Sequence, residues 1–210
     1  DAAHDLCVAV QGDARPAALD SLCSIALARG DRPGFDRALA ELEQHGGGTN
    51  GWALTLRHGL RDRYDGHLQR AWSTFDALLT QLVDAEPVAR GAVWAELGET
   101  ERLLGRESAA EAYAEARACF DRSGREALCL RAEAGRVRTL LDQGVTPLRH
   151  DLDEGLSWAR SHGMDLLVLD LERVLGRLLG DAERLRSCRE RALGWGLRPR
   201  AGLIELWRAE

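Results

Sequence analysis

Apolar and small residues recur along the chain at the spacing of an α-helix. Ala109, Ala112, Ala116 and Phe120 form one such stripe, at positions i, i+3, i+7 and i+11. A similar stripe of leucine and valine runs along 167–178. No run of four or more residues alternates apolar and polar positions between turn signals, as a half-buried strand would. The pattern therefore predicts an all-α fold.

Glycines divide the helical pattern at regular intervals. The turn glycines Gly30, Gly66, Gly105, Gly144 and Gly180 are 36, 39, 39 and 36 residues apart. A second set of breaks, at 46–48, 86–87, 124, 163 and 198–199, interleaves with them. All five prolines fall at or just before an expected helix start, where a residue with a fixed φ and no N–H is tolerated.

These breaks predict five antiparallel helix pairs, spanning 16–45, 52–85, 88–122, 126–162 and 165–194. We expect first helices near 16–29, 52–64, 88–104, 126–142 and 165–179, and second helices near 34–45, 67–85, 107–122, 148–162 and 182–194. Residues 1–15 are expected to hold part of a further helix and 201–210 a closing helix. One pair has too little apolar surface to be stable alone, so stacking predicts an α–α superhelix over the single domain 1–210.

Composition and charge exclude some classes of binding partner. The hydrophobic content is 45% and the charged content 30%, so we expect a folded protein. The net charge of −6 argues against binding to nucleic acid or to an anionic membrane. The most apolar run, "DLLVLDLERVLGRLLGD", is broken by charges. The five cysteines contain no CxxC pair and are expected to be buried thiols of a cytoplasmic protein. Because the first residue is Asp1 and a helical pattern follows at once, we expect the chain to be a piece of a longer protein.

Few residues suggest catalysis or metal binding. The pairs His4–Asp5 and His150–Asp151 suggest a metal phosphohydrolase, but Asp151 also suits the positive end of a helix dipole. No serine lies in G-x-S-x-G, and no phosphate-binding G-x-x-x-x-G-K-[ST] occurs. The sequence therefore predicts no catalytic residue, no metal and no cofactor, with a helical, metal-dependent enzyme domain as the alternative.

One expected pair carries a recognisable motif. Trp94, Leu97, Gly98, Gly105 and Ala110 match the W-x-x-L-G…G…A positions of the tetratricopeptide repeat, and the match ends after Ala110. The chain thus resembles the degenerate tetratricopeptide-like repeats of large bacterial signalling proteins, such as activators of the maltose-regulator type and multidomain ATPases. The resemblance implies that Ala110 packs against the opposing helix. It also implies a concave face, lined by first helices, that binds peptides, partner domains or small effectors.

Charged residues recur beside the apolar stripes of the expected first helices. They are Arg57, Arg61, Glu99, Arg102, Arg131, Arg138, Arg173 and Arg177. Because stacked pairs bring equivalent positions side by side, we expect a row of arginines along one groove. Arginine presents a planar fork of donors that suits carboxylates, so the row predicts an acidic peptide or partner surface as the ligand. In the alternative interpretation, each arginine pairs with a nearby glutamate on the solvated side.

Together these patterns predict a non-catalytic protein-interaction or effector-sensing module of a bacterial signalling or transcription-regulatory protein. The expected partner is a protein, a peptide or a neighbouring domain of the same parent chain. A helical enzyme domain and a purely structural spacer are the alternatives.

Overall fold

A computed structural model describes residues 15–44, 51–147 and 150–197 of the chain. Over these ranges the protein has ten helices and no strand, which confirms the predicted all-α fold for this part of the chain. The helices expected before residue 15 and after residue 200, together with Cys7 and the His4–Asp5 pair, lie outside the described residues.

The helices alternate between first and second members of each pair, as the turn spacing predicts. The first helices are α2 (Arg15–Arg29), α4 (Gly51–Tyr64), α6 (Pro87–Leu103), α8 (Glu126–Asp142) and α10 (Asp165–Leu179). The second helices are α3 (Arg32–Gln44), α5 (Leu68–Gln81), α7 (Ala109–Asp121), α9 (His150–Ser161) and α11 (Ala182–Gly194).

Only α5 departs from its expected bounds by more than two residues. It ends at Gln81 rather than at residue 85. Pro87 begins α6, and Glu86 before it adopts an extended conformation with ψ of 138°. A proline ring disfavours helical geometry in the preceding residue, which accounts for the extended Glu86 but not for the earlier end of α5 at Gln81.

The turn glycines end the first helices in the left-handed backbone conformation. Gly30 and Gly105 both have a φ of +69°, which side chains with a Cβ rarely adopt. The two residues after the C-cap residue Leu104 also cap carbonyl groups of α6: Gly105 N donates to Arg102 O at 3.0 Å, and Arg106 N donates to Glu101 O at 2.9 Å. These are the bonds of a Schellman cap, so the periodic glycines mark true helix ends.

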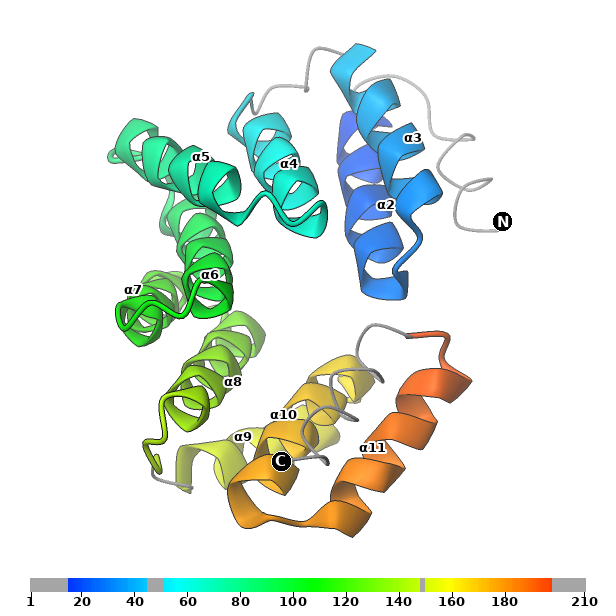
Figure 1. Cartoon of the computed structure of the whole chain (residues 1–210), viewed down its shortest axis with the longest axis vertical. Helices are drawn as coiled ribbons and strands as arrows, with labels where there is room; N and C mark the ends of the chain where they lie inside the picture. The colour runs from blue at the N-terminus through cyan, green and yellow to red at the C-terminus, as the bar shows by residue number, and fades with distance from the viewer. Residues whose placement is uncertain (1–14, 45–50, 148–149, 198–210) are drawn as a thin grey trace.

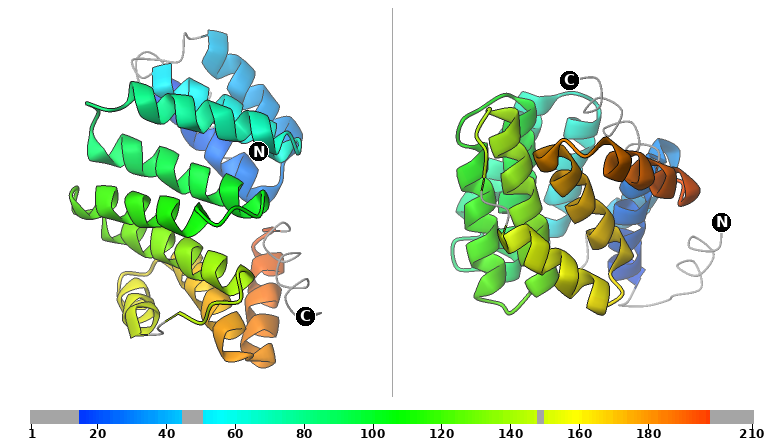
Figure 2. Two further views of the ribbon diagram at one scale, coloured as in Figure 1. Left: turned by 60° about the vertical axis from the view of Figure 1, so that its left-hand side comes forward. Right: turned by 90° about the horizontal axis from the view of Figure 1, so that it is seen from below.

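The helices follow one another around an arc, with α4, α6 and α8 on its inner side and α5 and α7 on its outer side (Figure 1). Neighbouring first helices contact each other from α4 to α6, from α6 to α8 and from α8 to α10 (Figure 2). At the ends of the arc, Ala28 of α2 packs against the apolar cluster that α10 and α11 form around Leu169 and Leu185. The first and last described pairs therefore touch.

One pair departs from this regular packing. In the other four pairs the two helices pack closely on each other, whereas α9 packs mainly on α10 and only lightly on its own partner α8. The connection between α8 and α9 spans 143–149 and is longer than those within the other pairs. Because this connection is long, α9 can lie apart from α8. This arrangement leaves a space beside α8 on the side of α7.

Glycines inside the first helices let the second helices approach closely. A Cβ built on Gly91 of α6 would lie 2.7 Å from Cε1 of Phe120 and 3.1 Å from Cβ of Cys119, both on α7. A Cβ on Gly59 of α4 would overlap the ring of Phe75 on α5 in the same way. Both rings are buried, so the glycines make room for the largest side chains of the core.

The buried small residue at the start of α7 is Ala109, which is fully buried, whereas Ala110 is partly exposed. Ala109, Ala112 and Ala116 form the buried stripe, and Ala110 lies about 100° away from it around the helix. The packing position that the tetratricopeptide motif implies for Ala110 is thus taken by its neighbour.

The four cysteines within the described ranges, Cys23, Cys119, Cys129 and Cys188, are buried and free, as predicted for them. Burial raises the pKa of Cys23 and of Cys188 to about 11, so both remain protonated thiols at neutral pH. Of the helices that the structure describes, none has the length and apolar character needed to cross a membrane.

We predict that Gly91→Ala destabilises the protein by about 1–3 kcal/mol, because the added methyl group overpacks the contact with Phe120 and Cys119. Urea unfolding followed by circular dichroism measures the change. Gly194→Ala, at an exposed position of α11 with no atom in reach of the new methyl group, is the control and should be neutral or slightly stabilising. Equal stability of Gly91→Ala and the unchanged chain would contradict the close approach of α6 and α7.

Candidate functional site

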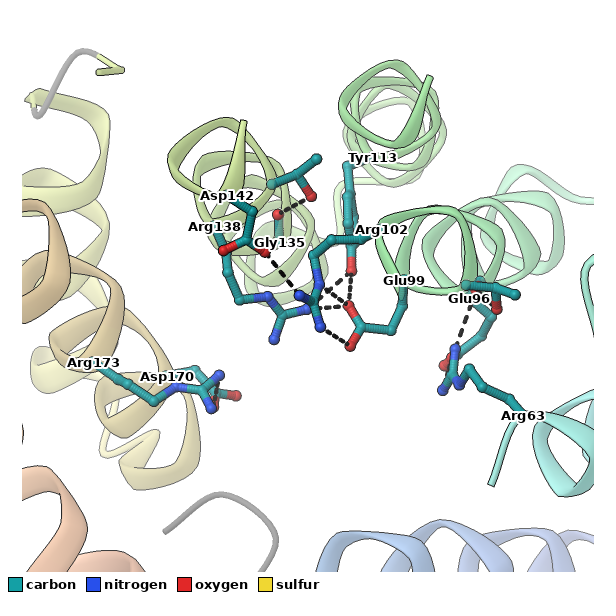
Figure 3. Close-up of polar contacts among 12 residues, drawn as sticks. Arg63, Glu96, Glu99, Arg102, Tyr113, Gly135, Arg138, Asp142, Asp170 and Arg173 are labelled. Atoms are coloured by element: carbon teal, nitrogen blue, oxygen red, sulfur yellow. Dashed lines mark hydrogen bonds and ion pairs between the residues drawn. The ribbon is translucent and has the colours of Figure 1, made fainter. Parts of the chain in front are cut away.

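A network of charged side chains lies on the inner side of the arc and centres on Glu99 of α6 (Figure 3). Arg102, one turn further along α6, donates from Nε and Nη2 to the two carboxylate oxygens of Glu99, each at 3.0 Å. Arg138 of α8 donates to Oε2 of the same carboxylate. Tyr113 of α7 donates its hydroxyl hydrogen to that oxygen at 2.8 Å. One carboxylate therefore joins three helices.

Tyr113 reaches this network from the outer layer, and two glycines open its path. A Cβ on Gly98 of α6 would lie 3.0 Å from Cδ2 of the ring, and a Cβ on Gly135 of α8 would overlap Cε1. The ring thus fills a slot between the two first helices, and its hydroxyl emerges beside Glu99 and Arg138 (Figure 3). The packing of the core and the arrangement of polar groups on the inner face therefore both depend on the side chain of Tyr113.

The network fixes the protonation of its members. Burial tends to raise the pKa of Glu99, but the charges of Arg138 and Arg102 outweigh burial and hold that pKa well below its usual value. Burial, followed by the negative charge of Glu99, raises the pKa of Tyr113. At neutral pH Glu99 therefore stays ionised and Tyr113 stays protonated, and neither is suited to exchange a proton with a substrate.

Asp142 extends the network from α8 to α10. Its Oδ2 accepts a hydrogen bond from Nη1 of Arg102 at 2.8 Å, and its Oδ1 accepts one from Arg177 of α10. Arg173 lies one turn before Arg177, is buried, and has Nη2 3.6 Å from the carboxylate of Asp170. Figure 3 shows Arg173 and Asp170 facing the same inner space as Arg138 and Glu99.

Ion pairs continue in the other direction, towards the first helix of the series. Arg63 of α4 pairs with Glu96 of α6, with Nη2 at 2.7 Å from Oε2. Arg57 of α4 forms a two-pronged pair with Asp20 of α2, at 2.7 and 2.8 Å. Each pair of neighbouring first helices is therefore joined by at least one ion pair.

We call these interhelical pairs the first-helix ladder. Its members are Arg57–Asp20, Arg63–Glu96, Arg138–Glu99 and Arg177–Asp142. The two residues of three of the pairs are 37, 39 and 35 positions apart in the sequence, close to the spacing of the turn glycines. The ladder thus recurs with the helix pairs themselves.

The structure brings together most, but not all, of the charged residues that the sequence singles out. Arg57, Glu99, Arg102, Arg138 and Arg177 belong to the ladder or bind it directly, and Arg173 faces the same space. Arg61 is partly exposed and Arg131 is exposed, and neither takes part in these bonds.

In the alternative interpretation, each arginine of the row pairs with a nearby carboxylate. The ladder arginines do form such pairs. The pairs run between neighbouring first helices rather than along the solvated side of one helix.

Five polar residues of this site were not expected from the sequence: Asp20, Arg63, Glu96, Tyr113 and Asp142. Three of the four ladder pairs could have been found from the sequence, because their opposite charges recur at a separation of about one helix pair.

The search for similar proteins adds no family to these observations. No protein-family model matches the chain, and none of the curated proteins is significantly similar to it. Within 15–44, 51–147 and 150–197, no three histidine, cysteine, aspartate or glutamate side chains are arranged to hold a metal ion. The first-helix ladder is therefore the feature from which a function can be inferred.

We predict that Glu99→Gln lowers the free energy of unfolding at pH 7 by about 2–4 kcal/mol, because Arg102 and Arg138 lose their shared carboxylate. The folded-state pKa of Glu99 is lowered, so its stabilising effect is fully present above its ordinary value of 4.5 and declines as the pH falls below it. Urea unfolding of both proteins between pH 7 and pH 3 should show the difference shrinking below about pH 4.5.

Glu115→Gln, on the exposed side of α7, removes the same charge outside the network and serves as the control. It should change stability by less than about 0.5 kcal/mol at every pH. A pH-independent loss in Glu99→Gln would show that its carboxylate charge does not hold the helices together.

Proposed function

We propose that the chain is a non-catalytic protein-interaction or effector-sensing module whose binding surface is the inner side of the arc. The first-helix ladder is the observation that carries this proposal. It ties the five first helices to one another and presents polar groups from several of them in fixed positions. A surface organised in advance loses little conformational entropy on binding, which favours recognition of a partner.

The charge of this surface favours an acidic partner. The ladder and Arg102 together hold five arginines and four carboxylates, in a chain whose net charge is −6. Arg131 adds an exposed guanidinium to the same face of α8 as Arg138, two turns nearer the start of the helix. We propose that an acidic peptide segment binds here, with Arg131 as its most accessible contact and the paired arginines contributing their remaining N–H groups.

The protonation of the network supports a binding role over the enzyme alternative. General acid–base catalysis near neutral pH requires a group whose pKa lies close to the working pH. Glu99 and Tyr113, which meet on the inner face, have pKa values displaced in opposite directions away from neutrality. We therefore assign them the role of holding the surface in shape.

The resemblance to tetratricopeptide-like repeats also favours one class of parent protein for such a module. We propose a cytoplasmic bacterial signalling or transcription-regulatory protein, with the acidic segment supplied by another protein or by a neighbouring domain of the same parent chain. The buried free thiols are in keeping with a reducing compartment.

Site-specific crosslinking tests the proposal. Peptides selected from a display library with this chain as bait should be enriched in Asp and Glu, and their affinity should fall with rising salt. A benzophenone amino acid in place of Arg131 should crosslink them, whereas the same group in place of exposed Glu115 of α7 should not. Equal crosslinking from both positions, or selected peptides without acidic residues, would contradict binding on the inner face.

The variant Arg131→Glu completes this test. Because Arg131 is exposed and takes no part in the ladder, its reversal should weaken the selected peptides at least about tenfold while the melting temperature stays within a few degrees of the unchanged chain. Unchanged affinity would remove Arg131 from the binding surface.

A further inference from the structure

A cavity of about 400 Å³ lies between α7, α8 and α9, away from the first-helix ladder. It occupies the space that opens because α9 packs on α10 rather than closely on α8. Glu126 and Glu133 of α8 line it. The helical period places these two residues on the side of α8 opposite Arg131 and Arg138, so the cavity and the inner face are separate surfaces.

The walls of the cavity combine an apolar floor with an acidic rim. Leu130 and Cys129 of α8 lie at its base, and Trp158 of α9 forms one side. The ring of His162 stacks on Trp158 with the ring centres 4.2 Å apart, which fixes the orientation of the indole. Five carboxylates come from all three helices: Asp121, Glu126, Glu133, Asp151 and Glu154.

One guanidinium already occupies part of this cavity. Arg117 of α7 places Nη1 3.0 Å from Oε2 of Glu133 and 3.6 Å from Oδ2 of Asp151, and so bridges α8 and α9. Among the described residues that line the cavity, it is the one that is basic. Asp121 and Glu126 are exposed on its rim and form no ion pair with any described residue. The cavity is thus built to hold a guanidinium and retains carboxylates for a second one.

We propose that this cavity binds an arginine side chain of a partner protein. Glu133 is paired with Arg136 as well as with Arg117, so Asp121 and Glu126 supply the exposed carboxylates for a second guanidinium. The flat guanidinium can stack on the indole of Trp158 while its fork of donors meets Asp121 and Glu126. Arginine is favoured over lysine because only a planar group satisfies the stacking and the paired hydrogen bonds together.

A pair of matched peptides tests the proposal on the 210-residue chain. The probes are acetylated, amidated Ala-Ala-Arg-Ala-Ala and the same peptide with citrulline, which keeps the planar shape and loses the charge. In ¹⁵N NMR titrations the arginine peptide should shift the Trp158 indole N–H and the Gly155 amide, and should bind at least tenfold more tightly than the citrulline peptide. Absence of those two shifts, or equal binding of the two peptides, would overturn the proposal.

A charge-matched pair of variants separates the cavity from general attraction to an acidic protein. Asp121→Asn with Glu126→Gln should weaken the arginine peptide at least tenfold, because charge-assisted hydrogen bonds are lost. Asp76→Asn with Glu111→Gln makes the same change of charge at exposed positions of α5 and α7 and should leave the affinity within twofold. Equal weakening in both variants would show that the peptide responds only to net charge.

Thermal unfolding of both variants checks that they remain folded, which is expected because all four residues are exposed. A lysine peptide should bind less tightly than the arginine peptide. If it binds equally well, the cavity recognises charge alone and the assignment to arginine fails.

Discussion

The carboxylate of Glu99 costs free energy to remove from water, and the way this cost is met shapes the centre of the molecule. Arg102, Arg138 and the hydroxyl of Tyr113 all donate to it, and they belong to three different helices. Tyr113 can donate only because Gly98 and Gly135 leave a slot for its ring. The spacing of α6 and α8, the placement of α7 behind them and the charge of the inner face therefore meet at one partly buried carboxylate.

Helix positions could be predicted from the sequence because their causes are local. Gly105 ends α6 through its own backbone conformation, and Pro87 begins the same helix through its own ring. The ladder could not be predicted in this way, since Arg63 pairs with Glu96 only when two separate helices meet at a particular rotation. A periodic sequence fixes which residues share a face of one helix, but it leaves open the rotation of each helix against the next.

The same distinction explains why the motif placed Ala110 where the structure has Ala109. A shift of one residue turns a side chain by about 100° around a helix, so a small error in alignment moves a residue from the core to the surface. Tyr113 shows the reverse effect. Its ring lies in the core and its hydroxyl in the polar network, and no local pattern distinguishes such a residue from an ordinary buried aromatic.

The loosening of the α8–α9 pair follows from the composition of α10. Leu167, Val168, Leu171 and Leu175 are all buried, so α10 is apolar over much of its circumference and can pack against several helices at once. Both α8 and α9 contact it. Because α9 packs mainly on α10, the space beside α8 stays open to the carboxylates of its rim.

As a result, α8 separates two surfaces of opposite character. Arg131 and Arg138 lie on its inner face, whereas Glu126 and Glu133 lie on the face towards the cavity. Charges on opposite sides of a helix are about 10 Å or more apart, a distance at which salt screens exposed groups from one another. The acidic peptide and the arginine side chain that we propose as ligands would therefore contact different side chains. The two surfaces also share helices, because α7 supplies Tyr113 to one and Arg117 to the other, and α8 likewise supplies Arg138 and Glu133.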